Sequence, residues 1–514
     1  MSLLRRALWG LLLVVAAGCR SEPPPDGITV LVEAPPDSLD GRFALTAIGQ
    51  RMVQLIAPGL LTFDDTSRPV PELAESFRAL SPTLVEFTLR PGLTFHDGTA
   101  LTSEDVKATY DGVRSKALQS PKVDRYAPVE EVEVVDDRTV RFHLRGAYAP
   151  LLAELSLSII PAERAGLDGV ALQASHPVGA GAFRFESQPD EEHLTLVPFE
   201  GYHLGPPAIP RLYFRVVRDE TTRVLELLKG RADLVTNAVS PAVLPLLRKQ
   251  PGLRVLVRPG TGYAYLGFNL RPGPLADVRV RQAVCHLLEV KPLAEHKFHG
   301  LAEPATSMIP ATHWAYTPGE GCRYNPAEAA RLLDEAGYGD PDGPGGLPRL
   351  RLSLKVSTDR FRKSVALVLQ EQLARGGIAV EVRSLEFGTL FNDIRRGNFE
   401  MVTLKWASVI EPDLMRNVYH SSNVPTEENH WGGLNRGALM DPELDALLEE
   451  ASQVELSERK AAYARVGARL EELLPYAPLW HESSVAVVSR RLEGFEPSAH
   501  NFISSLARAR KVGP

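Results

Sequence analysis

Strict alternation of hydrophobic and polar positions predicts a β-strand at residues 85–89. Val85, Phe87 and Leu89 are apolar and the positions between them are polar, as expected when one face of a strand packs and the other meets water. A Pro-Gly pair ends this strand. Thr102 then lies three residues before Asp105 at the start of a segment with helical spacing, so we predict a strand, a loop and a capped helix.

The segment 131–145 repeats the alternation on both sides of an Asp-Asp pair. This pattern predicts an antiparallel hairpin. His143 falls on its polar face, where we expect it to be solvated.

The last third of the chain alternates between helical and strand periods. Asn325 is placed to cap a helix that begins at Pro326 and stops before Gly337. We expect strands near 350–356, 378–382 and 399–406, helices at 361–375, 390–396 and 443–474, and a last strand within 475–488. Such alternation predicts an α/β fold, with a mostly parallel sheet and helices on both faces.

Length, composition and charge describe an ordinary globular chain. Its 514 residues suggest about three domains, and 44 % hydrophobic with 24 % charged residues is typical of soluble folds. The net charge is −7 and no window is densely basic. Nucleic-acid binding is therefore disfavoured, because phosphate neutralisation needs a surface rich in Lys and Arg.

The N-terminus has the features of an export signal. Arg5 and Arg6 precede an apolar run at 7–18 that is too short to span a bilayer. Ala-Ala-Gly-Cys closes this run and resembles a lipoprotein box, so we expect cleavage before Cys19 and lipid attachment to its thiol. The alternative is a plain secretory signal with Cys19 incidental. Residues 20–26 are rich in proline and predict an extended tether.

Besides Cys19, the sequence contains two cysteines, Cys285 and Cys322. The exported compartment permits a disulfide between them. Cys285 lies in an apolar helical run, however, so a buried free thiol is equally compatible with the sequence.

Residues 87–106, FTLRPGLTFHDGTALTSEDV, resemble the signature of extracellular solute-binding proteins of bacterial ABC transporters, family 5, which captures oligopeptides, dipeptides and nickel. Other segments resemble the same family: PVGAGAFRF at 177–185, GRADL at 230–234, LGFN at 266–269 and VRVRQAV at 278–284. The resemblance thus extends well beyond one motif.

The resemblance implies a periplasmic-binding-protein-like fold with two α/β lobes, a hinge and an extra α+β domain. Domain I is expected to comprise 27–50, 176–265 and 476–514, domain II 51–175, and domain III 266–475. It also implies a monomer without cofactor or catalytic activity, which captures a peptide or peptide-like solute. Its partners would be an ABC permease and ATPase, and Cys19 would anchor it to membrane lipid on the extracytoplasmic side.

The strand pattern and the family resemblance each indicate candidate ligand contacts. Ligands of open α/β sheets collect at the carboxyl ends of the strands, and Trp406 ends one such strand, where it could wall a ligand or belong to the core. Tyr263 and Tyr265 alternate towards one side of a strand, where core packing and ligand contact are both plausible. The resemblance adds Asp37, in a turn that lies beside the ligand in the family. The candidates are Trp406, Lys405, Ala407, Ser408, Val409, Glu411, Tyr263, Tyr265, Asn269 and Asp37.

Two departures from the family weaken the expectation of a free peptide N-terminus. Peptide-binding members carry an Asp three residues after the Trp, which holds the α-ammonium group, and here that residue is Val409. The acid of oligopeptide binders two positions before the Asn is Gly267 here. A charged nitrogen cannot be desolvated against valine without another partner. These differences favour a blocked, modified or non-peptide solute, or a peptide held by its main chain.

Metal and catalytic motifs are weak. His296 and His299 are three residues apart with His313 nearby, a spacing that can bind metal, but no acid or cysteine cluster completes the set, so we expect solvated histidines. Neither HExxH nor GxSxG occurs. Alternatives to a peptide receptor are a receptor for nickel, a metallophore or another solute, an envelope chaperone or structural lipoprotein, and an exported hydrolase.

Overall fold

A computed structural model describes residues 26–340, 342–343 and 346–513. The expected signal peptide, Cys19 and most of the tether lie outside these residues. None of the helices in the described part of the chain combines the length and the apolar character that a membrane span requires.

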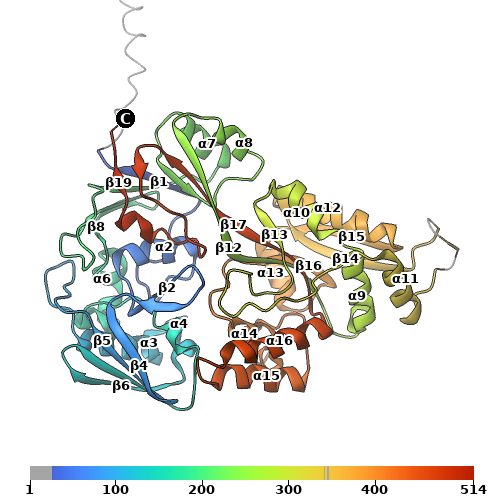
Figure 1. The fold of residues 1–514 in the computed structure, drawn as a ribbon, viewed down its shortest axis with the longest axis horizontal. Helices are drawn as coiled ribbons and strands as arrows, with labels where there is room; N and C mark the ends of the chain where they lie inside the picture. The colour runs from blue at the N-terminus through green and yellow to red at the C-terminus, as the bar shows by residue number, and fades with distance from the viewer. Residues whose placement is uncertain (1–25, 341, 344–345, 514) are drawn as a thin grey trace, which may run out of the picture.

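The largest element of the described chain is an eleven-stranded mixed sheet (Figure 1). Its strands, in spatial order, are β15 (Ile378–Leu385), β14 (Leu350–Ser357), β16 (Met401–Trp406), β12 (Leu253–Phe268), β17 (Tyr476–Ser489), β11 (Leu234–Thr236), β1 (Ile28–Val32), β10 (Leu212–Val216), β9 (His193–Pro198) and β8 (Phe183–Asp190), with β13 (Ala302–Pro304) paired to β17.

Two long strands join the halves of this sheet. β12 and β17 have 16 and 14 residues and pair antiparallel across its centre. Their register shifts between Arg258 and Gly262 and again between Ala264 and Tyr265. We call the side with β1 and β8–β11 the first lobe and the side with β14–β16 the second lobe (Figure 1).

The expectation of a mostly parallel sheet holds only within parts of the lobes. β14 is parallel to β15 and β16, and β1 is parallel to β10 and β11. The pairs of β12 with β16 and β17 are antiparallel, because the chain passes back and forth between the lobes.

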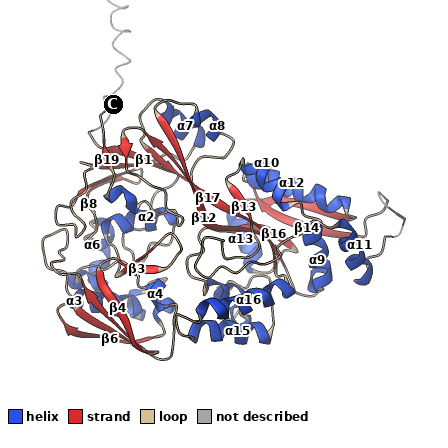
Figure 2. Cartoon of the chain, viewed as in Figure 1, coloured by secondary structure: helices blue, strands red, loops and turns tan. Residues whose placement is uncertain are grey.

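Helices cover both faces of the second-lobe sheet, as predicted. The helices α9 (Val278–His286), α10 (Val290–Phe298), α11 (Pro326–Glu335) and α12 (Arg360–Arg375) pack in one core with the inward residues of β14. The opposite face packs against α13 (Phe387–Arg395) through Leu390 and Ile394. Figure 2 shows α10 and α12 beside the strands of this lobe. Asn325 caps α11 through the Glu328 amide, as the sequence indicated.

In the first lobe, α2 (Ala47–Ile56) packs on β1 and β8–β10. The helices α7 (Glu220–Leu228) and α8 (Leu244–Arg248) face the long strands. Asp219 caps α7 by accepting a hydrogen bond of 2.8 Å from the Thr222 amide.

A separate four-stranded antiparallel sheet contains the elements with the clearest sequence pattern. Its order is β4 (Ala74–Ser81), β5 (Leu84–Leu89), β7 (Thr139–Leu144) and β6 (Val129–Asp136), and α3 (Ser103–Arg114) covers it. Thr102 and Asp105 form the predicted capping box. His143 Nε2 lies 2.8 Å from a Glu133 carboxylate oxygen, so this histidine is paired and not merely solvated.

The predicted helix at 443–474 is two helices, α15 (Pro442–Gln453) and α16 (Arg459–Leu473). The break follows from Val454, whose extended backbone ends α15. They pack with α14 (Leu414–Tyr419) in a core that also includes Tyr263, Tyr265 and Tyr476 of the long strands. Figure 2 shows α15 and α16 below the large sheet.

Cys285 and Cys322 form a disulfide with a Cα–Cα distance of 5.0 Å. Cys285 is also buried in its helix. The sequence left a disulfide and a buried free thiol as alternatives, and burial of Cys285 and the disulfide occur together. The short elements are β2 (Leu61–Phe63), β3 (Pro69–Pro71), α4 (Leu151–Glu154), α5 (Ala162–Ala165), α6 (Val170–Ser175), β18 (Leu492–Glu493) and β19 (Arg510–Lys511).

Candidate functional site

A cleft of about 370 Å³ lies between the two lobes, over the centre of the long strands. The first lobe contributes Glu220, Asn237 and Ser240, and the second lobe contributes Phe361 and Lys405. Because its walls come from both lobes, its width depends on the angle between them. We call it the main cleft.

A second cavity of about 250 Å³ adjoins the main cleft at the carboxyl ends of β14 and β16. Ser357 and Trp406 end these two strands, and Phe387 and Phe391 of α13 also line the cavity. Arg362 lines this cavity and the main cleft alike. We call it the side pocket.

The local sequence explains why Arg362 lies at the carboxyl ends of these strands. β14 ends at Ser357, and Asp359 caps α12 by accepting a hydrogen bond of 2.8 Å from the Arg362 amide. The strand-to-helix turn is therefore short, and the first turn of α12 stands at the carboxyl end of the sheet. This is where ligands of open α/β sheets bind.

Trp406 lies where the sequence predicted, as a wall of the side pocket. It is half-buried, and its indole Nε1 is buried with no hydrogen-bond partner in the described chain. The Arg436 guanidinium lies 5.5 Å from the centroid of its ring. The position at the pocket is observed, and contact with a ligand stays a prediction.

Lys405 and Ala407, its neighbours, also reach the cavities. The Lys405 ammonium forms an ion pair of 2.5 Å with Glu482 of β17. Its charge is therefore compensated inside the protein, and it is a weaker anion site than its position in the sequence indicated.

Several candidates have structural roles away from both cavities. Val409 is fully buried in the core of α14–α16, and its amide donates to the Thr261 carbonyl. The Ser408 hydroxyl lies 2.6 Å from that of Thr261. The Glu411 carboxylate is paired with Arg459. These residues follow Trp406 in the sequence, but the chain turns into the core after Ala407.

Tyr263 and Tyr265 belong mainly to the core. Each is 2 % exposed, and their rings stack with centroids 5.7 Å apart. Tyr265 also stacks on Tyr476 at 4.0 Å and borders the side pocket. Tyr263 therefore packs in the core.

Asn269 and Asp37 organise backbone instead of lining a cavity. The Asn269 amide donates to the Gly397 and Phe399 carbonyls at 2.8 and 2.7 Å. The Asp37 carboxylate accepts hydrogen bonds from the Leu45 and Thr46 amides. Both residues hold turns in place, and neither lines the main cleft or the side pocket.

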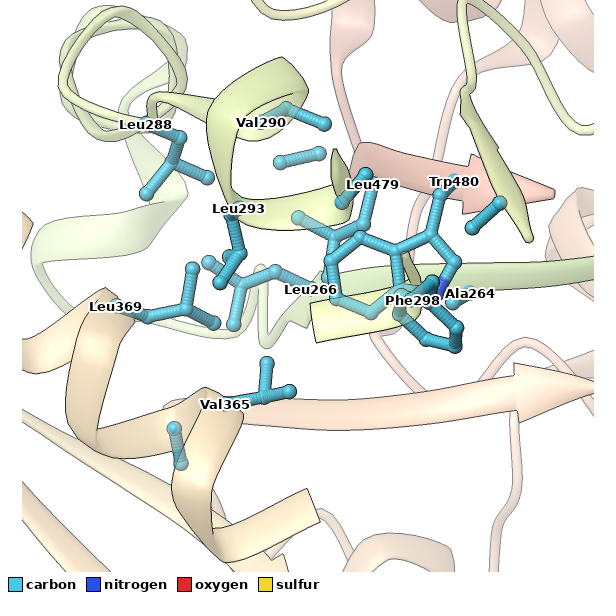
Figure 3. Close-up of a cluster of buried hydrophobic side chains, with 14 of the residues drawn as sticks. Ala264, Leu266, Leu288, Val290, Leu293, Phe298, Val365, Leu369, Leu479 and Trp480 are labelled. Atoms are coloured by element: carbon cyan, nitrogen blue, oxygen red, sulfur yellow. The ribbon is translucent and has the colours of Figure 1, made fainter. Parts of the chain in front are cut away.

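The sequence missed an aromatic wall of the main cleft. Trp480 is 3 % exposed and packs against Phe298 with ring centroids 5.1 Å apart (Figure 3). Both residues line the cleft together with Ala264, and the indole Nε1 of Trp480 has no partner in the described chain. The sequence predicted only a last strand within 475–488, and no local pattern indicated that Trp480 contacts Phe298 of α10.

Arg362 and Arg436 were missed as well. The rule about carboxyl ends of strands could have found Arg362, which follows the strand at 350–356. No local pattern connects Arg436 with Trp406, because Arg436 comes from a loop after η5 (Ser421–Asn423).

The three histidines that the sequence offered as candidate metal ligands do not form a cluster. His296 and His299 are exposed, whereas His313 is buried with Nε2 2.8 Å from the Ile410 carbonyl oxygen. Burial lowers the pKa of His313 to about 4, so the expectation that it is solvated was wrong. Within the described ranges, no group of three or more His, Cys, Asp or Glu side chains could hold a metal ion.

Comparisons with known proteins agree with this architecture. The sequence model for bacterial extracellular solute-binding proteins, family 5 Middle, matches residues 68–425. The chain is 26 % identical over 447 residues to the oligopeptide-binding protein AppA of Bacillus subtilis, covering 82 % of this chain and 80 % of that protein. It is 27 % identical over 468 residues to heme-binding protein A of Haemophilus influenzae, covering 84 % and 82 %. The structure of NikZ from Campylobacter jejuni in complex with Ni(L-His) has a TM-score of 0.81 at 22 % identity, covering 95 % of this chain and 100 % of that chain.

Proposed function

The chain belongs to the bacterial extracellular solute-binding proteins of family 5, and from this premise we propose that it captures an oligopeptide or peptide-like solute and delivers it to an ABC permease. The family consists of solute-binding proteins, not enzymes. ATP hydrolysis belongs to the partner subunits in the membrane.

The main cleft is the observation that carries this proposal. Its volume of about 370 Å³ falls within the range of small-molecule sites, which are concave and combine apolar walls with a few polar groups. Phe298, Phe361 and Trp480 supply apolar surface, and Asn237 and Ser240 supply polar groups. A solute bound there touches both lobes at once.

The mechanism is a shift in population between open and closed forms. A solute that touches both walls gains contacts only when the lobes approach, so it favours the closed form. To move a 1:99 population to 99:1, it must bind the closed form more tightly by about 5.5 kcal/mol. The permease recognises the closed form and receives the solute.

The solute is not held by a carboxylate at either position that peptide binders use. Val409 is buried in the core. A Cβ atom at Gly267 would lie 3.2 Å from the Tyr265 ring, so a side chain at that position would meet packed aromatic surface. The proposed cargo is therefore a peptide held by its main chain, or a peptide-like solute without a required free ammonium group.

We place the protein on the extracytoplasmic side of the membrane as a monomer, anchored by lipid on Cys19. Arg5 and Arg6, the apolar run and Cys19 support this placement. The domain boundaries stated above remain part of the proposal.

Native mass spectrometry tests the function directly. The protein is purified from its own cell envelope without denaturation, and the retained mass is identified after release. We expect one small solute per chain, which rebinds to stripped protein in calorimetry with and without a chelator. The proposal is wrong if no small molecule is retained and none of the envelope fractions binds, or if stoichiometric protein partners are found instead.

A further inference from the structure

Two arginines of the side pocket have no carboxylate partner in the described chain. The Arg362 side chain is half-buried and makes no hydrogen bond or ion pair among the described residues. The Arg436 guanidinium lies over two rings, 4.8 Å from the Phe391 centroid and 5.5 Å from that of Trp406. Its Nε is buried without a partner.

Four of the five fully buried arginines of the described chain are compensated, whereas Arg51 has only a hydrogen bond of 3.4 Å to the Thr236 hydroxyl. Arg42 is paired with Asp40 at 2.6 Å, and Arg459 is paired with Glu411. Arg281 donates to backbone carbonyls, including that of Leu275 at 2.7 Å. This is the general rule, because a buried charge without a partner is costly. The side pocket holds two half-buried arginines, Arg362 and Arg436, without a carboxylate partner among the described residues.

The lining of the side pocket leaves the positive charge uncancelled. It includes no Asp or Glu. A third cation, Lys405, is held by Glu482. Both guanidinium groups act on the same neighbour: burial raises the pKa of Tyr265, and the charges of Arg436 and Arg362, with a hydrogen bond from Arg436, oppose that rise. The two charges therefore converge on one small volume.

The chemistry of this volume suits a carboxylate. A guanidinium group offers parallel N–H donors that match the two oxygens of a carboxylate. The Arg436 guanidinium lies over the Phe391 and Trp406 rings, and such contacts reduce the entropy that binding would cost. The unpartnered Trp406 Nε1 belongs to the same wall.

We infer that the side pocket binds a carboxylate of the solute between Arg362 and Arg436, so that this chain selects acidic peptides or peptide-like acids. This inference rests on the proposed function, since the side pocket opens from the main cleft through the shared residues Arg362 and Lys405. The carboxylate is either a chain terminus or an acidic side chain.

Four blocked or partly blocked tripeptides test the inference by calorimetry on the whole mature protein. Acetyl-Ala-Glu-Ala-amide offers a side-chain carboxylate, and acetyl-Ala-Ala-Ala with a free C-terminus offers a terminal one. Acetyl-Ala-Gln-Ala-amide is neutral, and Ala-Gln-Ala-amide carries only an ammonium group. We expect at least one carboxylate peptide to bind roughly tenfold or more tightly than both others, and the tighter of the two identifies the source.

Charge-removing variants locate the effect. Arg362→Gln and Arg436→Gln should each weaken binding of the carboxylate peptide by about 10- to 100-fold, with little change for the neutral one. Arg360→Gln, exposed on the same helix, and Arg396→Gln, stacked on Trp431 outside the pocket, are the matched controls. Arg436→Lys keeps the charge and should recover part of the loss, which separates a charge effect from misfolding.

The inference is overturned if the neutral peptide binds as tightly as both carboxylate peptides. It is equally overturned if the arginine variants match their controls, or if none of the four peptides binds. The proposed function is judged separately, by the solute retained from the cell envelope. A retained cationic or neutral solute would leave the function standing and remove this inference alone.

Discussion

At the scale of single residues, two carboxylates, Asp413 and Glu411, lie close together beside α14. Asp413 is 4 % exposed and accepts a hydrogen bond from the Tyr463 hydroxyl at 3.3 Å. Burial, with the nearby Glu411 carboxylate, raises the pKa of Asp413 from 3.8 to about 6, and Arg416 and Arg459 oppose the rise. The folded state therefore prefers the protonated carboxyl.

This preference predicts a pH dependence of stability. Because the folded pKa of Asp413 lies above its unfolded value, its contribution is fully present below about pH 4 and is lost as pH rises through about 6. Asp413→Asn cannot ionise, so it should raise the free energy of unfolding at pH 8 by roughly 1–3 kcal/mol, with a smaller effect at pH 4.

Urea denaturation of both proteins at pH 4 and pH 8 provides the measurement. Glu455→Gln, at an exposed site on the link between α15 and α16, is the control and should change little at either pH. An Asp413→Asn variant that is less stable at pH 8 than the native protein would refute the raised pKa.

At the scale of elements, the disulfide fastens α9 to the segment that precedes α11. Cys285 ends the buried face of α9, and Cys322 lies 37 residues later, before the cap of α11 at Asn325. The bond closes a loop of about this length. It therefore reduces the conformational entropy of the unfolded second lobe.

Removing the bond should cost about 4 kcal/mol of stability by the loop-closure argument. The variant is Cys322→Ser together with Cys285→Ala, which keeps the buried position apolar. The free energy of unfolding in urea is compared with and without reductant. The native protein should lose stability on reduction, whereas the double variant should not respond. If reduction leaves the native protein unchanged, the bond is absent in solution.

Elements with a regular period were predictable from sequence, and their ends were not. The alternation at 85–89 and the cap at Thr102 gave β5 and α3 because both signals are local. The break between α15 and α16 was missed, since the hydrophobic pattern continues across it. His143 was placed on the correct face, but its partner Glu133 comes from the neighbouring strand.

At the scale of the whole molecule, the site is assembled from distant segments, and this is why sequence found only part of it. Trp406 was identifiable because it ends a strand of the α/β alternation. Trp480 and Arg436 reach the cavities only through tertiary packing. Val409, a candidate contact from the sequence, lies in the core, because the chain turns inward after Ala407.

The central claim is that the lobes close on a solute in the main cleft, by movement about β12 and β17. Small-angle X-ray scattering of the mature protein, stripped of cargo and then titrated with the solute released from native protein, measures this most directly. We predict a saturable decrease in the radius of gyration at one solute per chain, reversed when the solute is removed. An unchanged radius of gyration at full occupancy would contradict the account.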